Sequence, residues 1–194
     1  MGLFALESWA LGRWDLATLE TGCKPMSPST AVLFAVLALA LGARLLWAGA
    51  RAAEFAAMTG TALAALVGAV ELARGAWGFP LPWDLQSAGG ETSLGVMASG
   101  RMAPLSAVLF LLAAVAIAAQ GEWLGRYRAA RWVSSLTASA GLLVGAVVAL
   151  AHSTGTPFGY DEEGMPMALL TALTFVILHA GILLADKDGA LPRA

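Results

Sequence analysis

Five long apolar blocks, separated by polar or glycine-rich stretches, dominate the pattern of the chain. They cover Pro28–Ala50, Phe55–Arg74, Pro104–Ala119, Trp132–His152 and Met165–Ala185. A helix that crosses a bilayer needs about 20 predominantly apolar residues. The pattern therefore predicts an all-α fold, a polytopic integral membrane helix bundle with about five transmembrane helices. One membrane domain is expected to cover residues 1–194.

A short phrase recurs at the start of three of these blocks. It runs from Met26 to Phe34, from Met102 to Phe110 and from Met167 to Phe175, and each copy has a hydroxyl, an alanine and the phenylalanine at equal offsets. An internal repeat indicates repeated structural units. We expect three hairpins, at about residues 1–50, 53–121 and 131–186, followed by a cytoplasmic tail at 187–194. Only Leu3–Leu11 is apolar ahead of the first copy, so the first hairpin is expected to be truncated and to lack a sixth helix.

The phrases contain residue types that begin a helix sharply. In the first two copies a proline is expected at the first helical position, where no backbone donor is needed, with a hydroxyl in the first turn. The third copy has its proline before the methionine, so its start is expected to be built differently. The residues of this helix-start motif are Met26, Pro28, Thr30, Met102, Pro104, Ser106, Met167 and Thr171.

The second and fourth blocks place small residues at every fourth position, including Gly60, Gly68, Gly141 and Gly145. Such stripes let helix backbones approach closely within a bilayer. The alternative is that an alanine-rich composition produces this spacing by chance. The blocks that begin with the phrase are rich in Leu, Val and Phe, and are expected to face lipid or to fill gaps between the close-packed helices.

Composition and charge support a membrane protein and predict its orientation. Of the 194 residues, 59% are hydrophobic and only 12% charged, against about 25% charged in soluble domains. Seven of the 11 Lys and Arg residues lie in the loops after the first and third blocks and at the C-terminus, while most acids lie on the other side. Cytoplasmic loops collect Lys and Arg. This distribution predicts a cytoplasmic C-terminus and an N-terminal segment outside.

Several short motifs carry a family resemblance. The second copy contains Glu71-Leu-Ala-Arg-Gly75, Trp83-Asp-Leu85 and Gly100-Arg-Met-Ala-Pro104, and the third contains Met165-Pro-Met-Ala-Leu-Leu-Thr-Ala172. Together they resemble the multi-helix N-terminal membrane regions of bacterial sensor histidine kinases and diguanylate cyclases. The resemblance implies a location in the bacterial inner membrane and an input role in signal transduction. The chain ends at Ala194, where that family continues into an output domain, so no kinase or cyclase activity is expected.

The two histidines, His152 and His179, are candidates for a ligand or sensing site. A shared haem is not expected, because His179 lies about 18 Å along its helix from Met167 at 1.5 Å per residue, whereas His152 lies at the outer end. An ionisable side chain near mid-membrane is a functional candidate by default. The alternative is a neutral His179 imidazole that bonds a neighbouring helix, at Thr137 or Ser139.

Further candidates lie on the predicted outer side. Glu71 and Arg74 have the spacing of a helical ion pair, and the alternative is a ligand or proton site at the carboxylate. Trp83 and Asp84 begin the longest outer loop. Tyr160 precedes three acidic residues that could hold a hard cation, although a short acidic loop is usually only solvated. The sequence lacks nucleotide-binding motifs, zinc-ligand spacings and a nucleophile with its base, so no catalytic residue, metal or cofactor is predicted.

These observations favour a membrane-embedded sensory or input domain that anchors and relays a signal to a cytoplasmic output. Expected partners are the lipid bilayer and a protein partner or output domain, with a homo-oligomer as an open alternative. Nucleic acid is not expected. The alternative is a small scaffold or accessory subunit of a larger membrane complex. A coupled transporter fits less well, because few charges lie within the predicted spans.

Overall fold

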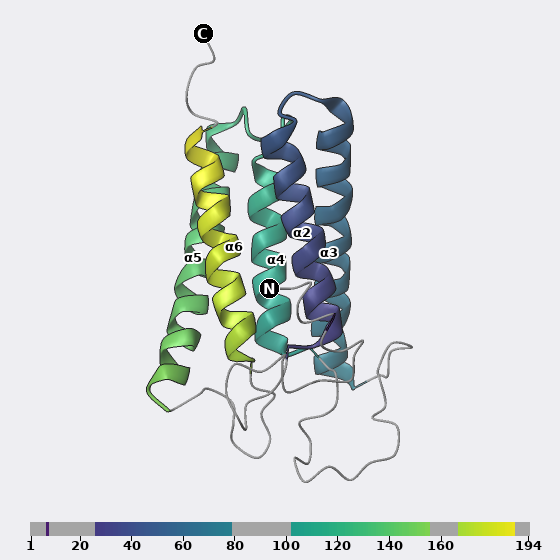
Figure 1. Cartoon of the computed structure of the whole chain (residues 1–194). Coiled ribbons are helices and arrows are strands. Elements are labelled where there is room, and N and C mark those ends of the chain that lie inside the picture. The colour runs from purple at the N-terminus through teal and green to yellow at the C-terminus, as the bar shows by residue number, and fades with distance from the viewer. Residues whose placement is uncertain (1–6, 8–25, 79–101, 156–166, 189–194) are drawn as a thin grey trace.

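The computed structural model describes residues 7, 26–78, 102–155 and 167–188. Five long helices make up most of this part of the chain, and it contains no strand. Figure 1 shows them as an upright bundle in which consecutive helices run in opposite directions. Their bounds are α2 Pro28–Leu46, α3 Arg51–Trp77, α4 Pro104–Ala119, α5 Arg128–Ser153 and α6 Leu169–Asp188.

The predicted all-helical bundle is confirmed for the described residues. Helices α2, α3 and α5 are long and apolar enough to cross a membrane, which indicates a membrane protein. Helix α4 and the apolar part of α6, Leu169–Ala185, are shorter than such a span. The described residues therefore support a helical bundle with three candidate spans, and the count of five spans stays a prediction.

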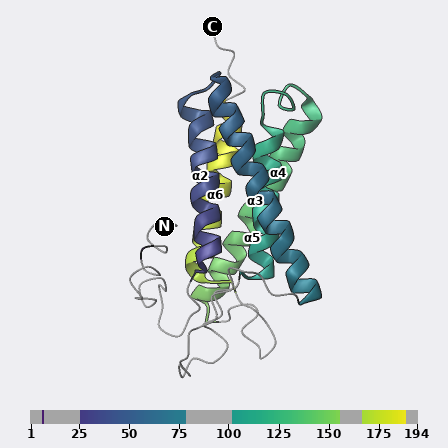
Figure 2. The ribbon, with the colours of Figure 1, turned by 90° about the vertical axis from the view of Figure 1, so that its right-hand side faces the viewer.

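The three helices that follow the Met phrases form the inner part of the bundle. Helices α2, α4 and α6 contact one another, α3 packs against both α2 and α4, and α5 packs against both α4 and α6. Figure 2, turned by 90°, shows α3 and α5 extending along the same long axis as the inner helices. The outer helices thus occupy the grooves between consecutive inner helices.

Each inner helix begins two residues after the methionine of its phrase, at Pro28, Pro104 or Leu169. The same backbone hydrogen bond also opens each helix. The amides of Ala31, Ala107 and Ala172 donate to the carbonyls four residues earlier, at 3.0, 3.2 and 3.0 Å. The third helix therefore starts at the same offset without a proline, although we expected a different start. Pro166 lies outside the described residues.

Three phenylalanines, one from each phrase, meet at the centre of the bundle. The ring centroids of Phe34, Phe110 and Phe175 are 4.9, 4.6 and 4.7 Å apart, and the rings meet at tilted or edge-on angles. Such pairs contribute about 0.5–1.5 kcal/mol beyond the area that they bury. The methionines of the three phrases and the hydroxyl residues four positions after them, Thr30, Ser106 and Thr171, are also buried. The phrase helices therefore form the core of the bundle, while other residues of the same helices, such as Leu39 and Ile177, point outward.

Glycines let the outer helices α3 and α5 pack closely against the inner helices. A Cβ on Gly68 of α3 would lie 3.2 Å from the carbonyl oxygen of Ala107 on α4, and one on Gly145 of α5 would lie 3.4 Å from that of Ala172 on α6. The glycines thus place the outer helices directly on inner-helix backbones. Large side chains of the same helices, such as Leu66 and Leu143, point outward and are more than 60% exposed.

Candidate functional site

A bidentate ion pair joins the end of α2 to the start of α3. Nε and Nη2 of Arg44 donate to Oε2 and Oε1 of Glu54, each at 3.0 Å. The two residues flank the tight turn between these helices, and their side chains are only 14% and 17% exposed. Charged hydrogen bonds in this parallel geometry are stronger than neutral ones and fix the relative orientation of both groups.

The same pair completes the end of α4. Nη1 of Arg44 donates to the carbonyl of Ile117 at 2.6 Å, and the amide of Glu122 donates to Oε1 of Glu54 at 3.1 Å. The last carbonyls of a helix lack the usual partners within the helix. That of Ile117 accepts from the Gln120 amide at 3.2 Å, and Arg44 gives it a second, charged donor. Gly121 permits this approach, since a Cβ there would lie 2.9 Å from Oε1 of Glu54.

Gln120, the residue that follows α4, joins the other two helices. Its side-chain nitrogen donates to Oγ of Ser134 on α5 at 3.0 Å and to the carbonyl of Ile182 on α6 at 2.9 Å. Ser134 is fully buried. Gln120 therefore connects the ends of α4, α5 and α6, at the same end of the bundle as the ion pair.

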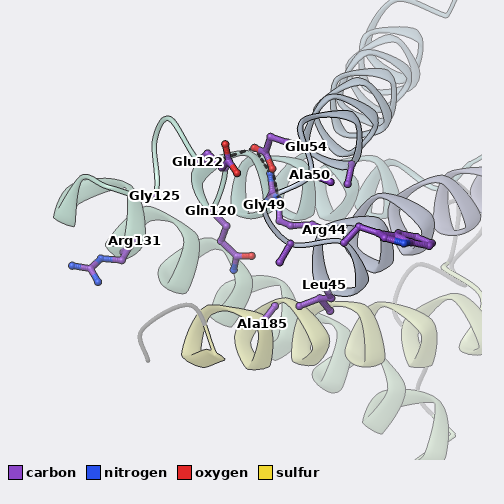
Figure 3. A pocket seen from close by; sticks show the side chains of 14 residues that line it. Arg44, Leu45, Gly49, Ala50, Glu54, Gln120, Glu122, Gly125, Arg131 and Ala185 are labelled. Carbon is purple, nitrogen blue, oxygen red and sulfur yellow. Dashed lines mark hydrogen bonds and ion pairs between the residues drawn. The ribbon is translucent and has the colours of Figure 1, made fainter. Parts of the chain in front are cut away.

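A pocket of about 660 Å³ opens among these groups. Figure 3 shows Arg44 and Glu54 on one side, Gln120 in the middle and Ala185 of α6 below. Arg131, which also lines the pocket, is exposed and has no ion-pair partner among the described side chains. With both signs of charge, an amide and the aromatic Trp47 in its wall, the pocket suits a small polar or amphiphilic molecule.

We expect Arg44→Ala to lower stability by about 1–2 kcal/mol, since it removes the donors to the Glu54 carboxylate and to the Ile117 carbonyl. The measurement is the midpoint of thermal unfolding in detergent. Arg51→Ala is the matched control, because Arg51 is an exposed arginine at the same end of the bundle without an ion pair in the described structure. Equal midpoints for the two variants would contradict the capping role of Arg44.

His179, the mid-helix candidate, is fully buried and lies against α5. Its Nδ1 bonds the carbonyl of Phe175 at 2.9 Å in its own helix, while Thr137 donates to Val133 at 2.7 Å and Ser139 is exposed. The expected bond from His179 to Thr137 or Ser139 is therefore wrong. Gly141 provides the space for the ring, since a Cβ there would lie less than 3.0 Å from three ring atoms.

The other described candidates lie on α5 and α3. His152 is buried, and its Nδ1 lies 3.0 Å from the carbonyl of Val148; it stands eleven residues beyond Gly141, about 16 Å along α5 from the ring of His179. Glu71 and Arg74 form a buried ion pair of 2.6 Å near the end of α3. Candidates Trp83, Asp84 and Tyr160 lie outside the described residues. The described part of the chain has no group of three His, Cys, Asp or Glu residues placed to hold a metal.

The sequence analysis did not predict the pocket. It counted three of its charged residues, Arg44, Glu54 and Arg131, only as loop charges that indicate the orientation of the chain in the membrane. The available signal was Arg44 and Glu54 on either side of a short turn, with Gln120 as the polar residue that ends an apolar block. No protein-family model, curated protein or solved structure matches the chain. The family resemblance therefore rests on the sequence motifs alone.

Proposed function

We propose that this protein is a membrane-embedded input module, in which all five helices cross the bilayer and a signal leaves the membrane through α6. The arginine-rich end, with the pocket, would face the cytoplasm of a bacterial inner membrane. No catalytic role is proposed. The apolar length of α2, α3 and α5 supports the membrane location. The pocket supports regulation by a molecule that binds at the arginine-rich end of the bundle.

The observation that carries the proposal is the hydrogen bond from Gln120 to the carbonyl of Ile182. Gln120 lines the pocket, and so does Ala185, one turn of α6 beyond Ile182. A molecule that enters the pocket can compete for the Gln120 amide. Loss of this bond would release the last turns of α6 from α4 and α5, and α6 is the helix that leads to the C-terminus.

The test is a fusion of the full chain to a cyclase reporter module after Ala194. Gln120→Leu removes the bond, and we expect it to change basal reporter output severalfold at equal membrane abundance. Thr137→Val is the matched control, because the Thr137 hydroxyl bonds only within α5. Insertions of one to four residues after Asp188 should make output vary with the helical period of 3.6 residues. Reporter output that is the same for wild type, Gln120→Leu and all insertions would reject the proposal.

A second candidate function is an accessory subunit of a larger membrane complex. The observation that favours it is an apolar surface on α2 and α6, where Leu39, Ile177 and Leu184 are 73%, 60% and 61% exposed. Stoichiometric co-purification of a tagged chain with a complex that lacks signalling components would favour this role over the input module.

A further inference from the structure

The polar side chains in the wall of the pocket fall into two groups, according to whether another part of the chain already bonds them. Arg44 and Glu54 form the first group. Arg44 donates through Nε, Nη1 and Nη2 to Glu54 and to the Ile117 carbonyl. The Glu54 carboxylate also accepts from the Glu122 amide. The two charges cancel and both side chains are largely buried, so this pair builds the wall and offers no free charge to a ligand.

The side chains of Gln120, Glu122 and Arg131 form the second group. The Gln120 nitrogen donates to the carbonyl of Ile182, which can only accept, so this contact identifies the nitrogen end of the amide. The other end, Oε1, is an acceptor without a donor among the described residues. Glu122 and Arg131 are exposed, and neither forms an ion pair in the described structure. The pocket therefore offers two acceptors, one of them charged, and one charged donor.

The second group lies on one ordered segment, which runs from the end of α4 to the first turns of α5. The turn in this segment is closed by hydrogen bonds from the amides of Leu124 and Gly125 to the Gly121 carbonyl, at 3.1 and 2.7 Å. Figure 3 shows Gln120 between Arg131 on one side and Arg44 on the other. The chain thus holds the three polar groups near one another without a ligand.

The charges of the pocket wall select against a ligand of a single sign. An anion alone would meet Arg131 but also the Glu122 carboxylate, and a cation alone would be repelled by Arg131. A molecule that carries both an ammonium group and an anionic group matches the whole set. Its ammonium can donate to Gln120 Oε1 and to Glu122, and its anion can accept from Arg131. Complementarity to both charges is a source of specificity.

The rest of the lining is suited to an amphiphile. It contains Leu45, Ala48, Ala53 and Ala185 together with Trp47, whose side chain is 62% exposed. Tryptophan collects at the level of the lipid head groups, and the face of its ring attracts an ammonium group. In the proposed membrane location, lipid head groups lie at this end of the bundle. The apolar lining therefore favours a zwitterionic group that carries acyl chains over a free amino acid.

We propose that the pocket binds a phosphoethanolamine group, with its ammonium at Gln120 Oε1 and Glu122 and its phosphate at Arg131. This group occurs in phosphatidylethanolamine lipids and, without acyl chains, in soluble glycerophosphoethanolamine. The proposal rests on the proposed function for the regulatory role of the pocket, because it names the molecule that would reach Gln120 and loosen its bond to α6. Binding itself requires no signalling.

The test is the thermal unfolding midpoint of the full chain in detergent, titrated with dihexanoyl phospholipids that have an ethanolamine, a choline or a glycerol head group. A ligand that binds the folded chain raises this midpoint. Choline has no N–H to donate and glycerol has no cation. We therefore expect half-maximal protection by the ethanolamine lipid at a concentration about fivefold lower than by the other two, the effect of roughly one hydrogen bond. Equal protection by glycerophosphoethanolamine would support the site and assign it to a soluble ligand, whereas weaker protection would support it and assign it to the bilayer.

Two variants locate the binding. Glu122→Gln should abolish the preference for ethanolamine over glycerol, and Arg131→Gln should weaken protection by the ethanolamine lipid about fivefold. Both side chains are exposed, so folding should not suffer. Arg128→Gln is the matched control, an exposed arginine in the first turn of α5 outside the pocket lining. Equal protection by all three lipids, or variants that behave like Arg128→Gln, would overturn the proposal.

The outcome can be separated from that of the proposed input role. The unfolding assay measures no output, and the reporter fusion with Gln120→Leu needs no added ligand. A responsive reporter without selective protection would reject this ligand and keep the input module. Selective protection with an unresponsive reporter would keep the phosphoethanolamine site and reject its link to α6.

Discussion

Gly141→Ala is expected to lower the free energy of unfolding by about 2–3 kcal/mol, as overpacking of a tight core does. The new methyl group would lie less than 3.0 Å from three atoms of the His179 ring. The ring has little room to move, because His179 is fully buried, bonds Phe175 through Nδ1 and contacts the Phe175 ring at a centroid distance of 5.8 Å. The measurement is the unfolding midpoint in detergent or bilayer.

Two further variants separate this contact from a general effect of alanine. Gly42→Ala places a methyl group in open space within α2, so we expect a neutral or slightly stabilising effect from helix propensity. Adding His179→Ala to Gly141→Ala should recover much of the lost stability. The corresponding pair in the second hairpin, Ala64 and Ala114, is alanine on both sides and is buried. A Gly141→Ala midpoint equal to that of Gly42→Ala would refute the contact.

Phe110→Ala should be similarly damaging, at about 2–4 kcal/mol, because it opens a cavity between the other two rings. Within a bilayer the loss is mainly one of van der Waals packing, since lipid is as apolar as the core. For a chain of this size the midpoint of thermal unfolding is then expected to fall by roughly 5–10 °C. Phe55→Ala is the control, because Phe55 is 75% exposed on α3. Comparable losses for Phe110 and Phe55 would contradict a central role for the ring cluster.

The approximate position of each described helix could be predicted from the sequence, because apolar runs of this length have few alternatives, but the ends of most helices could not. The predicted block 104–119 coincides with α4, whereas α3 begins at Arg51 rather than Phe55 and α5 begins at Arg128 rather than Trp132. Both extensions begin with arginines, which a hydropathy pattern excludes from a span although a helix tolerates them at its ends. The sequence did not predict which helices are inner and which are outer. That arrangement depends on which backbone carbonyl of a neighbouring helix each glycine contacts.

The candidate site was predictable only in fragments. The spacing of Glu71 and Arg74 predicts an ion pair within one helix, and the structure contains that pair. The partner of His179 was predicted wrongly, because Nδ1 of the ring bonds the carbonyl of Phe175, one turn earlier in the same helix, at 2.9 Å. The link between Arg44 and Ile117 joins residues 73 positions apart, and no local pattern indicates such a contact.

The phenylalanine cluster also bears on permeation. Three rings with centroids 4.6–4.9 Å apart fill the axis between α2, α4 and α6, and Leu37, Ile117 and Ile182 continue the apolar core towards the arginine-rich end. Among the described residues of α2, α4 and α6, no row of polar side chains crosses this plug, so we expect neither water nor an ion to pass between the inner helices. Under the proposed input role, a signal would therefore pass from one end of the bundle to the other as displacement of the helices themselves.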